Sequence, residues 1–349
     1  MKRHYPAIRG IAILLVVLNH TVTLGQDTPL SWGYPPASEP LAVILLFLKL
    51  IGWYAVPIFL FISGSFFAYA AQGDPPAISW KIVQNNVIHL LWPYLIWSVA
   101  FYALLFVGYG QTFSPLGYLK NLLVGFPYNF IPIILFYFLV SPILLKLSQR
   151  TGWIFVLAII ALYQIFLILA LDGYKIGITL PGFTRFFVVP VLARTFADWG
   201  IYFPLGLALT LNNSLVMPKL EKYKGVFLIT SLVFLVLAAL HSLTIYRFPL
   251  TNELYPLAFV FFLPVISRKW IPKIRFFESV GKRAFGLYLM HLLVLDSLLL
   301  LFNQYIPVLL SYQILLQPVL FMLTASIPLL VMRYAARYLK GGSYRIIFG

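Results

Sequence analysis

The amino-acid sequence contains no cysteine and few charged side chains. Only 10% of its 349 residues are Asp, Glu, Lys or Arg, whereas soluble domains carry about 25%. The absence of cysteine excludes disulfides, thiolate nucleophiles and acyl-cysteine intermediates. With 62% hydrophobic residues and a mean hydropathy of +0.93, the chain has more apolar surface than a soluble core of this size can bury. Part of that surface must therefore face lipid.

Acidic residues are the scarcer of the two charge types. Nine Asp and Glu against 25 Lys and Arg give a net charge of +16. A charge of this sign is also typical of nucleic-acid-binding proteins, but the sequence has no basic tail and no basic helix. The basic residues instead lie in short loops between apolar runs, as the positive-inside rule describes for membrane proteins. We therefore expect a lipid bilayer as partner and no nucleic acid.

Ten apolar runs approach the length of about 20 residues that a transmembrane helix needs. They cover residues 7–24, 45–71, 82–108, 128–146, 152–171, 187–211, 225–242, 252–267, 284–303 and 307–335. No small-residue cleavage site follows the first run, which favours a helix over a signal peptide. The second run is long enough to include a surface helix, with Lys49 and Gly52 near its end. The sequence thus predicts an all-α polytopic membrane protein with one membrane-embedded domain over residues 1–349.

The basic residues also predict the orientation of the chain. With the N-terminus in the cytoplasm, most of the Lys and Arg fall in cytoplasmic segments and the outside loops keep few bases. The reversed orientation would put the most basic loop, residues 268–283, outside the cell. About ten spans with both the N- and C-termini in the cytoplasm therefore satisfy the positive-inside rule.

Two ionisable residues in the first run suggest chemistry. Such residues are costly inside a span and usually face the protein interior or a water-filled cavity. Arg9 and His20 lie eleven residues apart, about three helical turns or roughly 16 Å, so they share nearly the same face. A guanidinium pairs well with phosphates, and a neutral imidazole can take a proton from an attacking hydroxyl, which suits a coenzyme A thioester. A positive-inside anchor at Arg9 and a hydrogen-bonded interior histidine at His20 are the alternatives.

Three short motifs occur in order along the chain. The first is AIRGIA at residues 7–12 with VVLNH at residues 16–20, the second is VPIFLFISG at residues 56–64, and the third is FGLYLMH at residues 285–291. Together they resemble the acyltransferase-3 family of integral membrane O-acyltransferases, over most of the chain. The small residues 63–65 of the second motif favour close helix packing over a nucleophile. We expect a stand-alone form, without the soluble esterase-like domain that this family often carries.

The resemblance implies an activity. Such an enzyme would move an acetyl or other short acyl group from cytoplasmic acyl-CoA to a hydroxyl of a cell-surface glycan or its lipid-linked precursor. His20 would be the general base, and Arg9 would contact the donor. No cofactor would be bound permanently, since acetyl-CoA or another acyl-CoA is the donor substrate. Other polysaccharide-synthesis proteins are candidate partners, and a bacterial inner membrane is the expected location.

The third span departs from the family pattern. The family usually carries arginines just before a Pro-Tyr pair, whereas residues 81–94 read KIVQNNVIHLLWPY and contain only two basic side chains. A phosphate grip therefore depends on these two residues and on the basic loop before the ninth span. The residues expected to hold the donor are Arg9, Lys81, His89, Lys282 and Arg283.

Polar residues toward the outer side are candidates for acceptor binding. Arg194 and Asp198 lie four residues apart and can pair on one helix face, so a simple salt bridge is the alternative to a binding role. A histidine in the ninth span can line a tunnel or make a helix-packing hydrogen bond. The candidate acceptor-binding residues are His291, Arg185, Arg194, Asp198 and Glu253.

Other functional classes stay open. No metal site is expected, since no histidine pair has the spacing of a helical zinc motif. A transporter or flippase for a glycan or small molecule would also place charged residues inside spans, although no internal repeat is visible. A structural partner in a polysaccharide-synthesis complex, without catalysis of its own, would tolerate His20→Ala.

Overall fold

The computed structural model describes residues 4–246 and 250–349. The chain is 82% helical, and the residues just named form no β-strand. The α-helices are α1 (Tyr5–Ser31), α2 (Glu39–Gly52), α3 (Ala55–Ala70), α4 (Trp80–Tyr109), α5 (Pro115–Val124), α6 (Phe130–Thr151), α7 (Trp153–Asp172), α8 (Ala193–Trp199), α9 (Tyr202–Leu211), α10 (Asn213–Ser242), α11 (Thr251–Phe262), α12 (Ile274–Gly281), α13 (Ala284–Tyr305), α14 (Pro307–Leu310), α15 (Gln313–Tyr338) and α16 (Gly341–Phe348). Four 3-10 helices also occur in the described chain: η1 (Gly173–Ile176), η2 (Gly182–Phe187), η3 (Leu263–Val265) and η4 (Arg268–Trp270).

Eight helical segments of the described residues are long and apolar enough to cross a membrane. They correspond to eight of the ten predicted runs, and one of them joins α2 to α3 at the expected junction near Gly52. The other two runs form shorter helices, α8 and α9 over residues 187–211 and α11 with η3 over residues 252–267. An all-α polytopic membrane protein is thus confirmed. The exact number of spans and the side on which the termini lie stay predictions.

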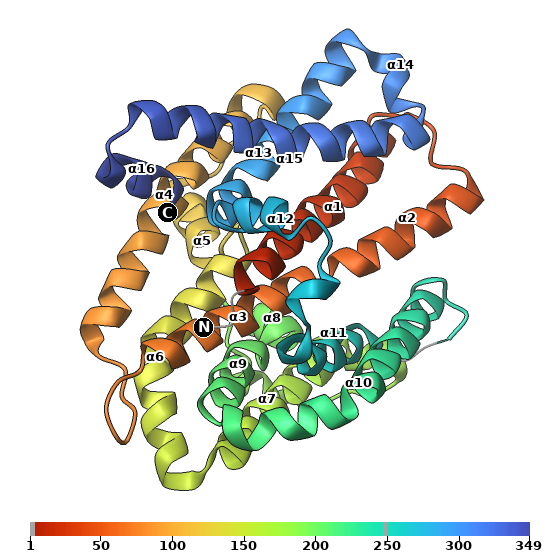
Figure 1. The fold of residues 1–349 in the computed structure, drawn as a ribbon. Coiled ribbons are helices and arrows are strands. Elements are labelled where there is room, and N and C mark those ends of the chain that lie inside the picture. The colour runs from red at the N-terminus through yellow and green to blue at the C-terminus, as the bar shows by residue number, and fades with distance from the viewer. Residues whose placement is uncertain (1–3, 247–249) are drawn as a thin grey trace.

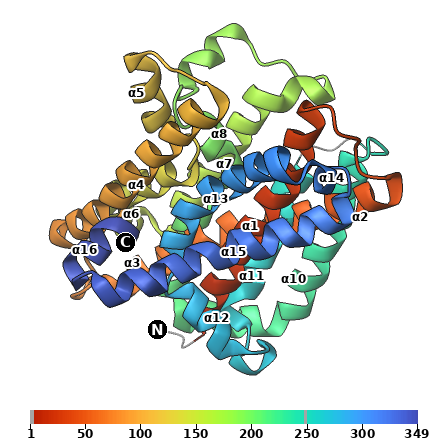
Figure 2. The same cartoon turned by 90° about the horizontal axis from the view of Figure 1, so that it is seen from above.

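Helix α1 runs through the middle of the bundle. Both views show it surrounded by other helices, and α2, α3, α12, α13 and α15 all pack against it (Figure 1, Figure 2). Its buried residues, including Ala7, Ala12, Ile13 and Val17, point in several directions around the axis. A helix that is apolar on all sides belongs in an interior. The predicted residues Arg9 and His20 therefore sit on the central helix of the molecule.

Two glycines let α1 and α12 cross in direct backbone contact. A Cβ atom on Gly10 would collide with the carbonyl oxygen of Phe277, and one on Gly281 would collide with the carbonyl oxygen of Pro6. Small residues at a helix crossing in a membrane let two backbones approach this closely. Since Lys282 follows Gly281 directly, the crossing places Lys282 beside the N-terminal turns of α1.

The second motif makes a similar crossing between α3 and α9. A Cβ atom on Gly64 would collide with the carbonyl oxygen of Phe203, and one on Gly206 would collide with that of Phe61. The hydroxyl of Thr210 on α9 also donates a hydrogen bond of 2.9 Å to Ser65 Oγ. Gly64 and Ser65 thus serve close helix packing, as the sequence indicates.

A side chain from another helix supports the break between α8 and α9. The amide nitrogen of Gln164, on α7, donates to the carbonyl oxygen of Ala197 at 2.8 Å, and its oxygen accepts from the backbone N–H of Ile201 at 3.0 Å. The hydroxyl of Tyr137 donates to the carbonyl oxygen of Gly200. Backbone groups freed by a helix break need partners when no water is available. Gln164 and Tyr137 supply them here.

Candidate functional site

A cavity of about 440 Å³ lies where the N-terminal parts of α1, α4 and α13 meet helices α3 and α6. Aromatic rings make up much of its wall: Phe59, Phe66, Phe67, Phe130, Phe138, Phe285 and Tyr288. The other polar side chains in the wall are Arg9, Ser63, Asn86, His89 and Lys282. An apolar cavity with a few convergent polar groups is the usual form of a small-molecule site. Two permanent cations and a histidine in one wall favour an anionic ligand.

Arg9 contributes a charge to this wall that is not paired with any Asp or Glu side chain of the described residues. Its guanidinium carbon lies 5.7 Å from the centre of the Phe66 ring. All nine Asp and Glu residues belong to the described part of the chain, yet none of them forms an ion pair with Arg9. A charge held inside a membrane protein without a partner is costly and is typical of a ligand-binding residue.

The structure brings together three of the five residues predicted to hold the donor. Arg9, His89 and Lys282 line the cavity, whereas Lys81 and Arg283 do not. Lys81 is exposed at the start of α4. Arg283 instead bonds back to α12, where it donates to the carbonyl and hydroxyl oxygens of Ser279 at 3.3 and 3.1 Å. All five were expected at the site because they lie near the same ends of their helices. Position along a helix does not show where a side chain points, and two of the five do not reach the cavity wall.

His20 and His291 face each other next to this wall. Their ring centres are 5.1 Å apart, although they come from helices at opposite ends of the sequence. The Tyr288 ring, which lines the cavity, lies 5.6 Å from the ring of His291. His20 is half-buried and does not itself line the cavity, while His291 is fully buried. The two histidines therefore lie behind Tyr288.

Helix α2 brings Lys49 close to His20. The side-chain amide of Asn19 donates a hydrogen bond of 2.9 Å to the carbonyl oxygen of Lys49. Gly52 permits this approach, since a Cβ atom there would lie 2.9 Å from the carbonyl oxygen of Leu15. The ammonium of Lys49 is therefore close enough to interact electrostatically with the imidazole ring of His20. Sequence reasoning identified Lys49 only as a residue near a helix junction, because spacing along one run does not reveal a contact with another.

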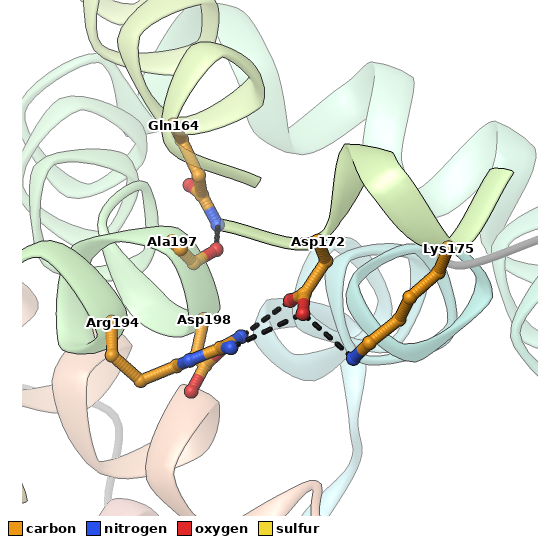
Figure 3. Close-up of polar contacts among 6 residues, drawn as sticks. All are labelled: Gln164, Asp172, Lys175, Arg194, Ala197 and Asp198. Carbon is orange, nitrogen blue, oxygen red and sulfur yellow. Dashed lines mark hydrogen bonds and ion pairs between the residues drawn. The ribbon is translucent and has the colours of Figure 1, made fainter. Parts of the chain in front are cut away.

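The predicted pairing of Arg194 with Asp198 exists, but another carboxylate binds Arg194 more closely. Two hydrogen bonds of 2.5 and 3.2 Å join Arg194 to Asp172, whereas its distance to Asp198 is 3.8 Å (Figure 3). Lys175 approaches Asp172 from the other side, at 2.7 Å. Asp172 thus ties α7 to α8, and Arg194 already has protein carboxylates around it. This arrangement favours the salt-bridge alternative over an acceptor-binding role for Arg194.

The remaining acceptor candidates do not form one group. Arg185 is exposed in η2 and makes no ion pair with a described residue. Glu253 lies in the first turn of α11, where its Oε2 atom is buried without a hydrogen-bond partner among the described residues. Asn252 Oδ1 beside it and Trp199 Nε1 at the end of α8 are also buried, and neither has a hydrogen-bond partner in the described part of the chain. His291 belongs with His20 on the inner helices, so the structure separates it from the other candidates.

The helices and the site define an integral membrane protein with a cation-lined cavity beside a histidine pair. A family model described as an acyltransferase domain matches residues 6–333. Because this match covers nearly the whole chain, the chain belongs to the acyltransferase-3 family of membrane acyltransferases. No curated protein and no solved structure matches the chain significantly.

Proposed function

We propose that this protein transfers a short acyl group, most simply acetyl, from acyl-CoA to a hydroxyl of a cell-surface glycan or its lipid-linked precursor. The observation that carries this proposal is the cavity in which Arg9 and Lys282 lie within one wall, next to His20 and His291. Coenzyme A has phosphates at one end and an acyl thioester at the other. The cations suit its phosphates, and the aromatic wall suits the less polar arm that leads to the thioester.

His20 acts as the general base in this proposal. Its imidazole takes the proton of the acceptor hydroxyl while the hydroxyl oxygen attacks the carbonyl carbon of the thioester. The tetrahedral intermediate then breaks its carbon–sulfur bond, and the imidazolium returns the proton to the departing thiolate. The products are the acylated acceptor and free CoA. Since the chain has no cysteine, any covalent intermediate would form on an oxygen or on His20 rather than on a thiol.

The donor reaches the site from the cytoplasm. The cavity lies at the N-terminal end of α1 and α13, and the basic segment over residues 268–283 leads directly into α13. By the positive-inside rule, such a segment faces the cytoplasm, where acyl-CoA is found. The acceptor approaches from the opposite side, where the carboxyl oxygen Oε2 of Glu253, which has no partner among the described residues, can accept a hydrogen bond from a sugar hydroxyl. No cofactor needs to be bound permanently.

Release of CoA from acetyl-CoA by purified protein in lipid tests this function. We expect His20→Ala to lower kcat by about 100-fold or more, as for loss of a general base, while donor binding persists. Arg9→Ala should weaken donor binding by roughly 10- to 100-fold, the effect of one charge-assisted hydrogen bond. Arg275→Ala is the matched control, because Arg275 is an exposed arginine on α12 outside the cavity wall. Thermal unfolding of each variant checks the fold.

The opposite result has a clear meaning. If the wild-type protein binds no acyl-CoA and releases no CoA with several short-chain donors and glycan acceptors, the transferase proposal fails. Transport of a glycan in the absence of acyl-CoA would then support a transporter or flippase. Equal effects of Arg9→Ala and Arg275→Ala on donor binding would remove the cavity from the donor site.

A further inference from the structure

Among the described residues, His20 has no hydrogen-bond partner that would orient its ring. No hydrogen bond joins its imidazole to another described residue, and Lys49, the nearby charged side chain, can only donate. A general base works best when a third group holds its ring and fixes which nitrogen carries the proton. In many enzymes a carboxylate does this. Here the described carboxylate on the neighbouring helix is Asp296, five residues beyond His291 in the sequence, and it makes no ion pair with a histidine.

His291 is itself held in one tautomer. Its Nδ1 atom lies 2.5 Å from the carbonyl oxygen of Tyr288. A carbonyl oxygen can only accept, so Nδ1 must carry the proton and Nε2 must present a lone pair. The side chain is fully buried, and Nε2 has no hydrogen-bond partner in the described chain. An unpaired acceptor at the centre of a helical bundle in a membrane is costly. A functional role for Nε2 of His291 would account for this cost.

The distance between the two rings fits a hydrogen bond. An N–H···N bond of roughly 2.9 Å between two imidazoles, each with its nitrogens about 1.1 Å from the ring centre, spans at most about 5.1 Å between centres. The ring centres of His20 and His291 are 5.1 Å apart, with 49° between their planes. This separation allows the hydrogen bond when a ring N–H of His20 is turned toward Nε2 of His291 along the line between the two ring centres.

We propose that His291 is the positioning residue for His20, rather than part of an acceptor-binding surface. Its Nε2 accepts the ring N–H of His20 and so leaves the other nitrogen of His20 free to take the acceptor proton. The same lone pair stabilises the imidazolium that forms. A neutral partner holds that proton less tightly than a carboxylate would, so the proton passes more readily to the departing CoA thiolate. This inference rests on the transferase function proposed above.

The test compares substitutions that keep or remove the acceptor at Nε2. Glutamine reaches the Nε2 position, leucine has a similar size without an acceptor, and asparagine can bond Tyr288 but is too short to reach His20. We expect His291→Leu and His291→Asn to lower kcat by about 100-fold, with the KM values for donor and acceptor within about threefold of wild type. His291→Gln should keep at least a tenth of wild-type kcat. Thermal unfolding and donor binding check the fold.

The possible outcomes distinguish failure of the transferase function from failure of the positioning role of His291. A wild-type protein without any CoA release would overturn the transferase function itself. Full kcat in His291→Leu or His291→Asn, in an active wild-type background, would overturn only the positioning role. A rise in the acceptor KM without a change in kcat would return His291 to acceptor binding. If His291→Leu does not fold, the pair of His291→Gln and His291→Asn decides the matter, and equal kcat in these two contradicts the inference.

Discussion

At the scale of single residues, a charged side chain that binds a ligand differs from a structural one because the protein itself supplies no oppositely charged partner for it. Arg9 and Arg194 are both arginines near helix ends, and the sequence makes both candidates for ligand binding. Arg194 lies between Asp172 and Asp198, so its charge is balanced within the protein. Arg9 lines a cavity and lies over the ring of Phe66, without an ion pair to a carboxylate side chain among the described residues. A ligand phosphate would supply what Arg9 lacks, whereas at Arg194 it would compete with two carboxylates.

Lys282 and Lys81 allow a charge in the cavity wall to be compared with a surface charge by experiment. Lys282 and Lys81 are both exposed residues near the same ends of their helices, but only Lys282 lines the cavity. We expect Lys282→Ala to weaken acyl-CoA binding by about 10-fold, because one charge-assisted contact to a phosphate is lost. Lys81→Ala should change it by less than about twofold, as for a screened surface charge. Calorimetric titration with a non-hydrolysable acyl-CoA analogue measures both. A larger effect at Lys81 would mean that the phosphates lie outside this cavity.

At the scale of helices, the short helix α12 is held in place by its contact with α1. A helix of 8 residues is not stable in isolation, and the crossing at Gly10 and Gly281 fixes its position. That crossing also determines where Lys282 lies relative to Arg9. The position of Lys282 beside Arg9 in the cavity wall therefore depends on one contact between α1 and α12, the short helix just before the ninth predicted span, and not on a local motif.

The crossing can be weakened without touching a polar group. In Gly10→Ala the new methyl group would meet the carbonyl oxygen of Phe277, a backbone atom that cannot move alone. We expect a loss of roughly 1–3 kcal/mol in stability, the usual effect of overpacking, together with weaker donor binding. Gly225→Ala on α10 is the control, since a Cβ atom there would meet nothing within 4 Å; it should stabilise α10 by up to about 1 kcal/mol. Thermal unfolding in detergent compares the two. Unchanged stability in Gly10→Ala would contradict the close crossing.

Helices were predictable from the sequence to the extent that each depends on its own residues. The eight long helices follow from apolar runs of sufficient length, which bury or face lipid whatever their neighbours. The break between α8 and α9 was not predictable, because Gln164 and Tyr137, which support it, belong to other helices.

The motif spacing placed Arg9 and His20 on one face of α1. It gave no indication that His291 would meet His20, since contacts between distant segments leave no periodic signal in one sequence.

At the scale of the whole molecule, the two kinds of polar site lie at different ends of the bundle. The cavity with Arg9 lies at the N-terminal end of α1, whereas the Asp172–Arg194 pair lies at the C-terminal end of α7. In the predicted orientation these are the cytoplasmic and outer sides. His20 and His291 lie between them on α1 and α13. An acyl group entering from the cytoplasm and an acceptor entering from outside would thus meet inside the bundle.

The absence of cysteine makes this orientation directly testable. Single cysteines can be placed at Thr179, in the exposed segment after η1, and at Lys222, exposed on α10, with no native thiol to interfere. We expect a membrane-impermeant maleimide to label Thr179→Cys in intact cells and to label Lys222→Cys only in inverted membrane vesicles, as the positive-inside rule requires. The reverse labelling would place the Arg9 cavity on the outer face. Cytoplasmic acyl-CoA could not then reach it, and the donor assignment would fail even if the fold and the histidine pair stood unchanged.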